Sequence, residues 1–168
     1  LSVAAGVQPQ SAAGGNFLTG LRQDATFRTN LTIANLKDEP AEVEVVFRGA
    51  DGAALGVPAR IPVEGRGVKQ LNAALSADVS SGGAGWTTPV PYFSAEVRLT
   101  KGSGVYPYAT VIDNVTGDAI VVTPVPRPSA KYRLPGILHY GPWISDVSLL
   151  NPTANERRVR LEYSYVKK

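Results

Sequence analysis

The chain contains a sequence pattern that recurs 116 residues further on. Residues 27–36 (FRTNLTIANL) are matched by residues 143–152 (WISDVSLLNP), and residues 42–47 (EVEVVF) are matched by residues 158–163 (RVRLEY). The two matches have the same offset, from 27 to 143 and from 42 to 158. A constant period of this size indicates tandem structural units. We therefore expect one unit followed by the first strands of a second.

The first unit has the sequence pattern of an antiparallel β-sandwich. Apolar and polar residues alternate over residues 27–33, as they do in a half-buried strand. Asp51-Gly52 fits the tight turn of a hairpin. Many short alternating segments with turn residues between them predict an all-β, immunoglobulin-like sandwich. Strands are expected near residues 27–33, 43–47, 60–63, 68–71, 93–99, 105–113 and 119–123. One short helical turn is expected within residues 72–78.

The repeat also predicts the domain boundaries. Residues 1–125 are expected to form the sandwich, residues 126–131 a proline-rich linker, and residues 132–168 a partial second unit. Within the first unit, residues 1–5 are expected to form a strand and residues 6–26 a long surface loop. This loop is a place to look for binding residues, because such residues concentrate in loops.

The partial second unit poses a packing problem, since two or three strands cannot bury an apolar face alone. Three solutions remain open. The natural chain continues with more strands, the segment packs on the first sandwich, or a neighbouring chain supplies the missing strands. The residues expected at such an assembly interface are Val147, Leu149, Val159, Leu161 and Tyr163, with Leu1 and Val3 in a potential donor strand.

Composition limits the class of protein. Hydrophobic residues make up 43% of the 168-residue chain and charged residues 18%, which is typical of a folded domain. Without cysteine there is no disulfide framework. No apolar run approaches the roughly 18 to 20 residues of a membrane-spanning helix. Residues 127–168 carry eight Lys/Arg and three Asp/Glu, but they do not show the clustered Lys/Arg interleaved with exposed aromatic residues over a defined fold that a nucleic-acid interface requires. We expect neither a membrane span nor a nucleic-acid partner.

Several stretches of the first unit resemble a known kind of repeat. Residues 27–31 (FRTNL) with Asn35, then Asp51-Gly52, then residues 109–118 (ATVIDNVTGD) are similar to repeats of bacterial secreted and surface proteins. This resemblance implies immunoglobulin-like sandwiches in tandem, in a secreted or cell-surface protein, sometimes behind a hydrolase domain. Such modules share no catalytic residues, so the resemblance transfers none.

Residues with potential chemistry are few. His139 is the only histidine, and Ser145 and Asp146 nearby would point to opposite sides of a strand, so no catalytic triad is expected. Residues 113–118 (DNVTGD) fit a hairpin turn better than a calcium loop, because the spacing and the distal glutamate of a calcium loop are missing. We expect no enzyme, no metal site and no cofactor.

Aromatic residues are the remaining candidates for binding a ligand. Trp86, Tyr106 and Tyr108 are candidates for stacking on a sugar if they share an exposed face. The sequence thus predicts an extracellular structural or adhesive module, self-assembling into filaments by strand addition between copies of the chain or neighbouring modules. The alternative is a carbohydrate-binding accessory module of a secreted hydrolase.

Overall fold

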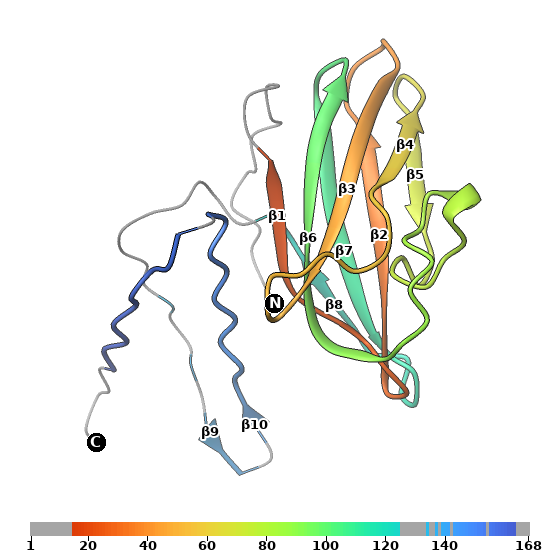
Figure 1. Cartoon of the computed structure of the whole chain (residues 1–168). Helices are drawn as coiled ribbons and strands as arrows, with labels where there is room; N and C mark the ends of the chain where they lie inside the picture. Colours follow the sequence, from red (N-terminus) through yellow and green to blue (C-terminus); the bar gives the residue numbers. More distant parts are fainter. Residues whose placement is uncertain are drawn as a thin grey trace.

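The protein is an antiparallel β-sandwich, as predicted (Figure 1). The computed structural model describes residues 15–124, 134, 137, 139–141, 143–153 and 155–163. Sheet A has the strand order β1-β6-β3-β4, and sheet B has the order β5-β2-β7-β8. The strands are β1 (Asn16–Gln23), β2 (Phe27–Asn35), β3 (Ala41–Gly49), β4 (Ala59–Val63), β5 (Val68–Leu71), β6 (Val90–Lys101), β7 (Val105–Asp113) and β8 (Ala119–Val122).

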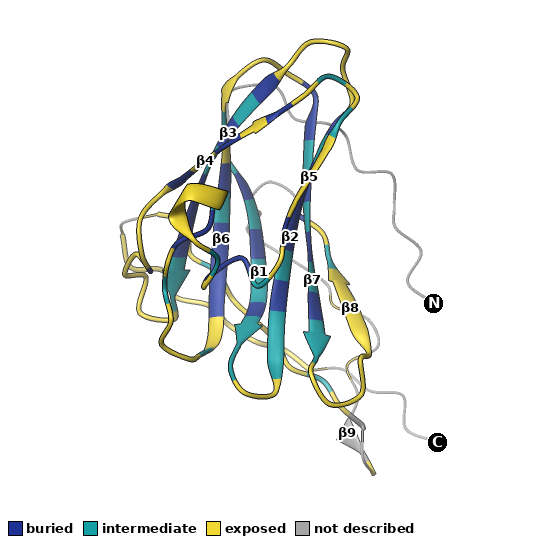
Figure 2. Ribbon diagram, turned by 90° about the vertical axis from the view of Figure 1, so that its right-hand side faces the viewer, coloured by how far each residue is buried: buried dark blue, intermediate teal, exposed yellow. Residues whose placement is uncertain are grey.

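The core lies between the two sheets, where Figure 2 shows the buried residues. Alternation in β2 turns Leu31 and Ile33 inward, and alternation in β3 turns Val43 and Val45 inward. At the end of β3 the Phe47 ring meets Phe93 of β6 edge to face, with ring centroids 5.9 Å apart. Period-two alternation therefore located the central strands correctly, because each has one face in this core.

Strand β1 corrects the expectation of a long loop over residues 6–26. Residues 16–23 pair with β6 at the edge of sheet A. Leu18 and Leu21 are both fully buried although they are three positions apart, because a β-bulge interrupts the register between them. Gly20 in this bulge has a φ of +75°, which glycine adopts without steric cost. The bulge breaks the alternation, so the pattern hid the strand. Leu1 and Val3 lie outside the described residues.

The short helical turn expected within residues 72–78 lies slightly later. Residues 72–76 form turns, and a 3-10 helix, η1, covers Val79–Ser81. Asp78 caps it, accepting hydrogen bonds from the Ser80 hydroxyl (2.5 Å) and the Ser80 backbone N–H (2.7 Å). These two bonds hold the pKa of Asp78 below its ordinary value.

Beyond β8, secondary structure is sparse among the described residues. A two-residue hairpin joins β9 (His139–Tyr140) to β10 (Trp143–Ile144), with Ile144 opposite His139. The described residues from 145 to 163 are assigned to no strand or helix. The linker predicted at residues 126–131 lies outside the described residues. No helix in the described part of the chain has the length and apolar character needed to cross a membrane.

Candidate functional site

The corner between β2 and β3 is held by one buried asparagine. The Asn35 side-chain N–H group donates to the carbonyl oxygens of Glu39 (2.8 Å) and Glu64 (3.2 Å). Its side-chain oxygen accepts a hydrogen bond from the backbone N–H of Lys37 at 3.0 Å. Here the chain leaves sheet B and enters sheet A. Asn35 therefore fixes the point at which the chain crosses between the layers.

The same turn occurs 116 residues later, around Asn151. Its side-chain N–H group donates to the Asn155 carbonyl at 2.7 Å, and its oxygen accepts from the Thr153 backbone N–H at 3.1 Å. These bonds run to the fourth and second following residues, as the bonds of Asn35 to Glu39 and Lys37 do. The repeated sequence thus forms the same local turn in both places. We call residues 143–153 and 155–163 the second corner.

The two corners differ in burial. In the second corner the apolar side chains predicted for assembly are 40 to 80% exposed, whereas their counterparts in β2 and β3 are 1% exposed or less. The matched pairs are Val147 with Leu31, Leu149 with Ile33, Val159 with Val43, Leu161 with Val45, and Tyr163 with Phe47.

The topology explains why the arms of the second corner do not pair with each other. Strands β2 and β3 lie in different sheets and have different neighbours. Residues 145–151 and 157–163, if equivalent to them, would each need strands from elsewhere. They are assigned to no ladder, and Figure 1 shows them diverging from the turn.

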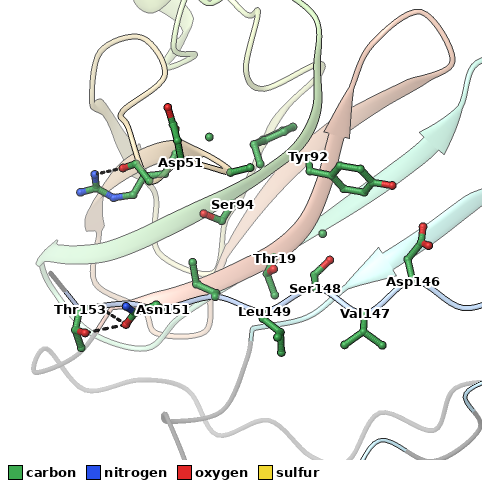
Figure 3. A pocket seen from close by; sticks show the side chains of 17 residues that line it. Thr19, Asp51, Tyr92, Ser94, Asp146, Val147, Ser148, Leu149, Asn151 and Thr153 are labelled. Atoms are coloured by element: carbon green, nitrogen blue, oxygen red, sulfur yellow. Dashed lines mark hydrogen bonds between the residues drawn. The ribbon is translucent and has the colours of Figure 1, made fainter. Parts of the chain in front are cut away.

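The second corner lies against sheet A, and an open groove of about 620 Å³ lies between the two (Figure 3). Thr19, Ser94 and Arg48 line the groove from neighbouring strands of sheet A, and residues 146–151 with Thr153 form the opposite wall. The two parts approach each other at the bulge, where a Cβ on Gly20 would lie 3.3 Å from the Ser148 hydroxyl oxygen. The second corner touches the first sandwich at this groove while its apolar side chains stay exposed.

Most of the charged and amide side chains in the groove already form hydrogen bonds within the protein. Arg48 donates to the Gly52 carbonyl, Asp51 accepts from the Ala53 backbone N–H, and Asn151 holds its own turn. Asp146, which was considered for a triad, lies in the groove wall. The side chain of His139 lies outside the described part of the structure. Both polar and apolar side chains thus line the groove between the sandwich and the second corner.

The outer face of sheet A is charged. Arg98 binds Glu96 through two hydrogen bonds of 2.7 and 2.8 Å, and this ion pair raises the pKa of Arg98. Glu44 of β3 lies opposite Arg98 in the register and 4.0 Å from Arg60 of β4. Exposed ion pairs of this kind contribute little stability but keep a sheet face hydrated.

The outer face of sheet B carries the tyrosines that the sequence singled out. Tyr106 and Tyr108 are neighbours on β7, with ring centroids 6.2 Å apart and ring planes 32° apart. Trp86 is not part of this group, because it packs against the core from a loop. Its indole N–H is buried and has no hydrogen-bond partner among the described residues. The structure brings together two of the three predicted aromatic residues.

Residues 113–118 form the predicted turn. Asp113 accepts hydrogen bonds from the backbone N–H groups of Val115 (2.7 Å) and Thr116 (3.2 Å). Asp118 accepts one from the Thr116 hydroxyl at 3.0 Å. Among the described residues, no group of three or more His, Cys, Asp or Glu could hold a metal ion. The carboxylates serve the turn.

Two of the three stretches that carry the resemblance lie side by side. Residues 27–35 pair with residues 105–113 along the whole β2–β7 ladder. Just beyond the ladder, the Asn114 side-chain oxygen accepts a hydrogen bond from Arg28 at 2.6 Å, and its N–H group donates to the Ala25 carbonyl at 3.3 Å. Much of this sequence signature therefore stabilises the sandwich.

Comparison with known proteins supports the fold and nothing finer. No family model matches the sequence, and no curated protein matches it. The crystal structure of Thermotoga maritima 1070 is similar, with a TM-score of 0.51 and 14% identity over 69% of this chain and 96% of that one. The Anabaena sensory rhodopsin transducer has a TM-score of 0.44 and 16% identity, over 58% of this chain and 85% of that chain. At 14% identity, the likeness to Thermotoga maritima 1070 shows the fold alone.

Proposed function

We propose that this chain is a structural or adhesive module of a secreted or cell-surface protein, built from sandwich units in series and assembled by strand addition. The supporting observation is the second corner. It has the local turn of the first corner, but the side chains that would form a core are exposed. We assign the chain no catalytic residue.

The free energy for assembly comes from the exposed apolar side chains. Full burial of one such side chain is worth about 1.5 to 3 kcal/mol. In the first unit, β7 and β5 flank β2, while β6 and β4 flank β3. Strands from a neighbouring copy would take the same places beside the arms of the second corner, supplying backbone hydrogen bonds as well as apolar contacts.

Light scattering coupled to size-exclusion chromatography over a range of concentrations tests assembly. We expect the mass of the full chain to rise with concentration, and the double variant Leu149→Asp/Leu161→Asp to remain a monomer. Val115→Asp is the matched control, because Val115 is an exposed apolar residue in the β7–β8 turn. A full chain that stays monomeric at every concentration would contradict assembly between copies.

A further inference from the structure

We infer that the outer face of sheet B binds a neutral saccharide chain, with Tyr106 and Tyr108 as its stacking platform. This binding goes beyond the proposed assembly, which uses the second corner and not this face. Both tyrosines point outward from β7, because their neighbours Val105, Pro107 and Ala109 point into the core. Sheet A covers the inner side of sheet B, and the second corner lies against sheet A.

The tyrosines are partly covered although they are on the outer face of the sheet. Tyr106 and Tyr108 are only partly exposed. Thr32 of β2 lies between Tyr108 and Gln70 in the register, also points outward, and is only 2% exposed. We attribute its burial to these two larger neighbours and infer that the Tyr108 ring lies over Thr32. A ring in that position presents its flat side to a ligand, which suits stacking against the C–H groups of a sugar ring.

Hydrogen-bonding groups continue the platform across the sheet. The Thr32 hydroxyl donates to the Gln70 side-chain oxygen at 3.3 Å, and the Gln70 amide N–H donates to the Asn72 side-chain oxygen at 2.8 Å. Each amide keeps further donor and acceptor capacity. Sugar hydroxyls both donate and accept, so a row of amides beside two rings matches their chemistry.

The charge of this face favours a neutral ligand. Its outward residues include no carboxylate and only one cation, Arg28, which is held by Asn114 at the end of the sheet. The outer face of sheet A, by contrast, carries ion pairs between Glu96 and Arg98 and between Glu44 and Arg60. The outward residues of sheet B are Arg28, Asn30, Thr32, Ala34, Val68, Gln70, Tyr106, Tyr108, Thr110, Ile112, Ala119 and Val121.

The side chains around the tyrosines favour a saccharide over a protein partner. Hot spots of protein interfaces are Trp, Tyr and Arg side chains that fill well-packed, fully desolvated pockets. The residues opposite the tyrosines on β2 are Ala34 and Thr32, and Thr110 follows Tyr108 along the outer face of β7. These small and hydroxyl-bearing neighbours place hydrogen-bonding groups beside two partly exposed rings, which suits a hydrated sugar chain.

Native gels containing hydroxyethylcellulose, galactomannan or laminarin test this inference. We expect at least one of these neutral polysaccharides to slow the full chain, and Tyr108→Ala to weaken the binding about tenfold, as expected for the loss of one aromatic stacking contact. Tyr108→Phe should keep most of the binding, because it keeps the ring. Tyr92→Ala is the control, since Tyr92 is an exposed tyrosine on β6 of the other sheet.

Three results would overturn the saccharide site: no retardation by any of the three polysaccharides, an equal loss in Tyr92→Ala, or loss of self-association in Tyr108→Ala, which would make the face a protein interface. Circular dichroism melting of each variant separates lost binding from lost folding. The test of assembly uses variants of Leu149 and Leu161 and not of Tyr108. The proposals of assembly and of saccharide binding can therefore be contradicted separately.

Discussion

The two corners of this chain show which part of a fold is encoded locally and which part depends on neighbours. Around Asn35 and Asn151 the chain makes the same hydrogen bonds to the second and fourth following residues. Around Asn35 the flanking apolar side chains are buried in a core, and around Asn151 they are exposed. The turn needs only its own residues, whereas burial needs strands that pack on both sides.

The largest difference between the corners is expected at the aromatic pair Phe47 and Tyr163. Phe47→Ala should destabilise the sandwich by about 3 to 5 kcal/mol, because it removes a buried ring and leaves a cavity beside Phe93. Tyr163→Ala should change the free energy of unfolding by less than about 0.5 kcal/mol. Urea denaturation of both variants at low concentration measures this. A loss of several kcal/mol at Tyr163 would show that the second corner already has packing partners.

The asparagines provide a second, smaller difference. Asn35→Ala removes the side-chain hydrogen bonds to the Glu39 carbonyl before β3 and to the Glu64 carbonyl between β4 and β5. It also removes the acceptor of the partly buried Lys37 backbone N–H. We expect a loss of about 2 to 3 kcal/mol. Asn151→Ala acts on an exposed turn and should cost under about 0.5 kcal/mol. Equal losses in urea denaturation would contradict the distinction between a buried and an exposed asparagine turn.

The contact between the corners is tested at Gly20. Gly20→Ala forces an alanine into a left-handed backbone conformation, at about 1 to 2 kcal/mol, and also crowds Ser148. Gly52→Ala carries a similar backbone strain, but its Cβ would meet no atom within 4 Å. Hydrogen exchange of residues 146–151 should therefore accelerate in Gly20→Ala and not in Gly52→Ala. Equal exchange rates in the two variants would show that the contact between Gly20 and Ser148 does not hold residues 146–151 in place.

The smallest effect concerns a local turn on the sandwich itself. Because the pKa of Asp78 is lowered in the folded state, its contribution to stability is present above the ordinary pKa and is lost as pH falls through the lowered value. Asp78→Ala should therefore lower stability slightly near neutral pH, and the difference from the parent protein should disappear as the pH falls through the lowered pKa, which flattens the acid-side decline. Thermal melts across this range measure the slope, and an unchanged acid slope would rule out Asp78 as a contributor.

Sequence patterns predicted the parts of this fold that depend on near neighbours. Alternation located β2, β3 and β7, and a spacing of two placed Tyr106 and Tyr108 on one face. Strand β1 was missed because its bulge puts Leu18 and Leu21 three residues apart. Trp86 lies in a loop, where spacing carries no information about direction. The order of strands in each sheet comes from contacts between distant residues, which no local pattern contains.

Under the proposed assembly, the crossing of the chain between two layers would also determine selectivity. An exposed single strand accepts any extended peptide with free backbone groups, which is the usual route to aggregation. In that assembly the two arms of the second corner would join opposite layers, so both would need strands at matching positions. A lone peptide can satisfy one arm at most, so such a corner would favour a complete sandwich edge.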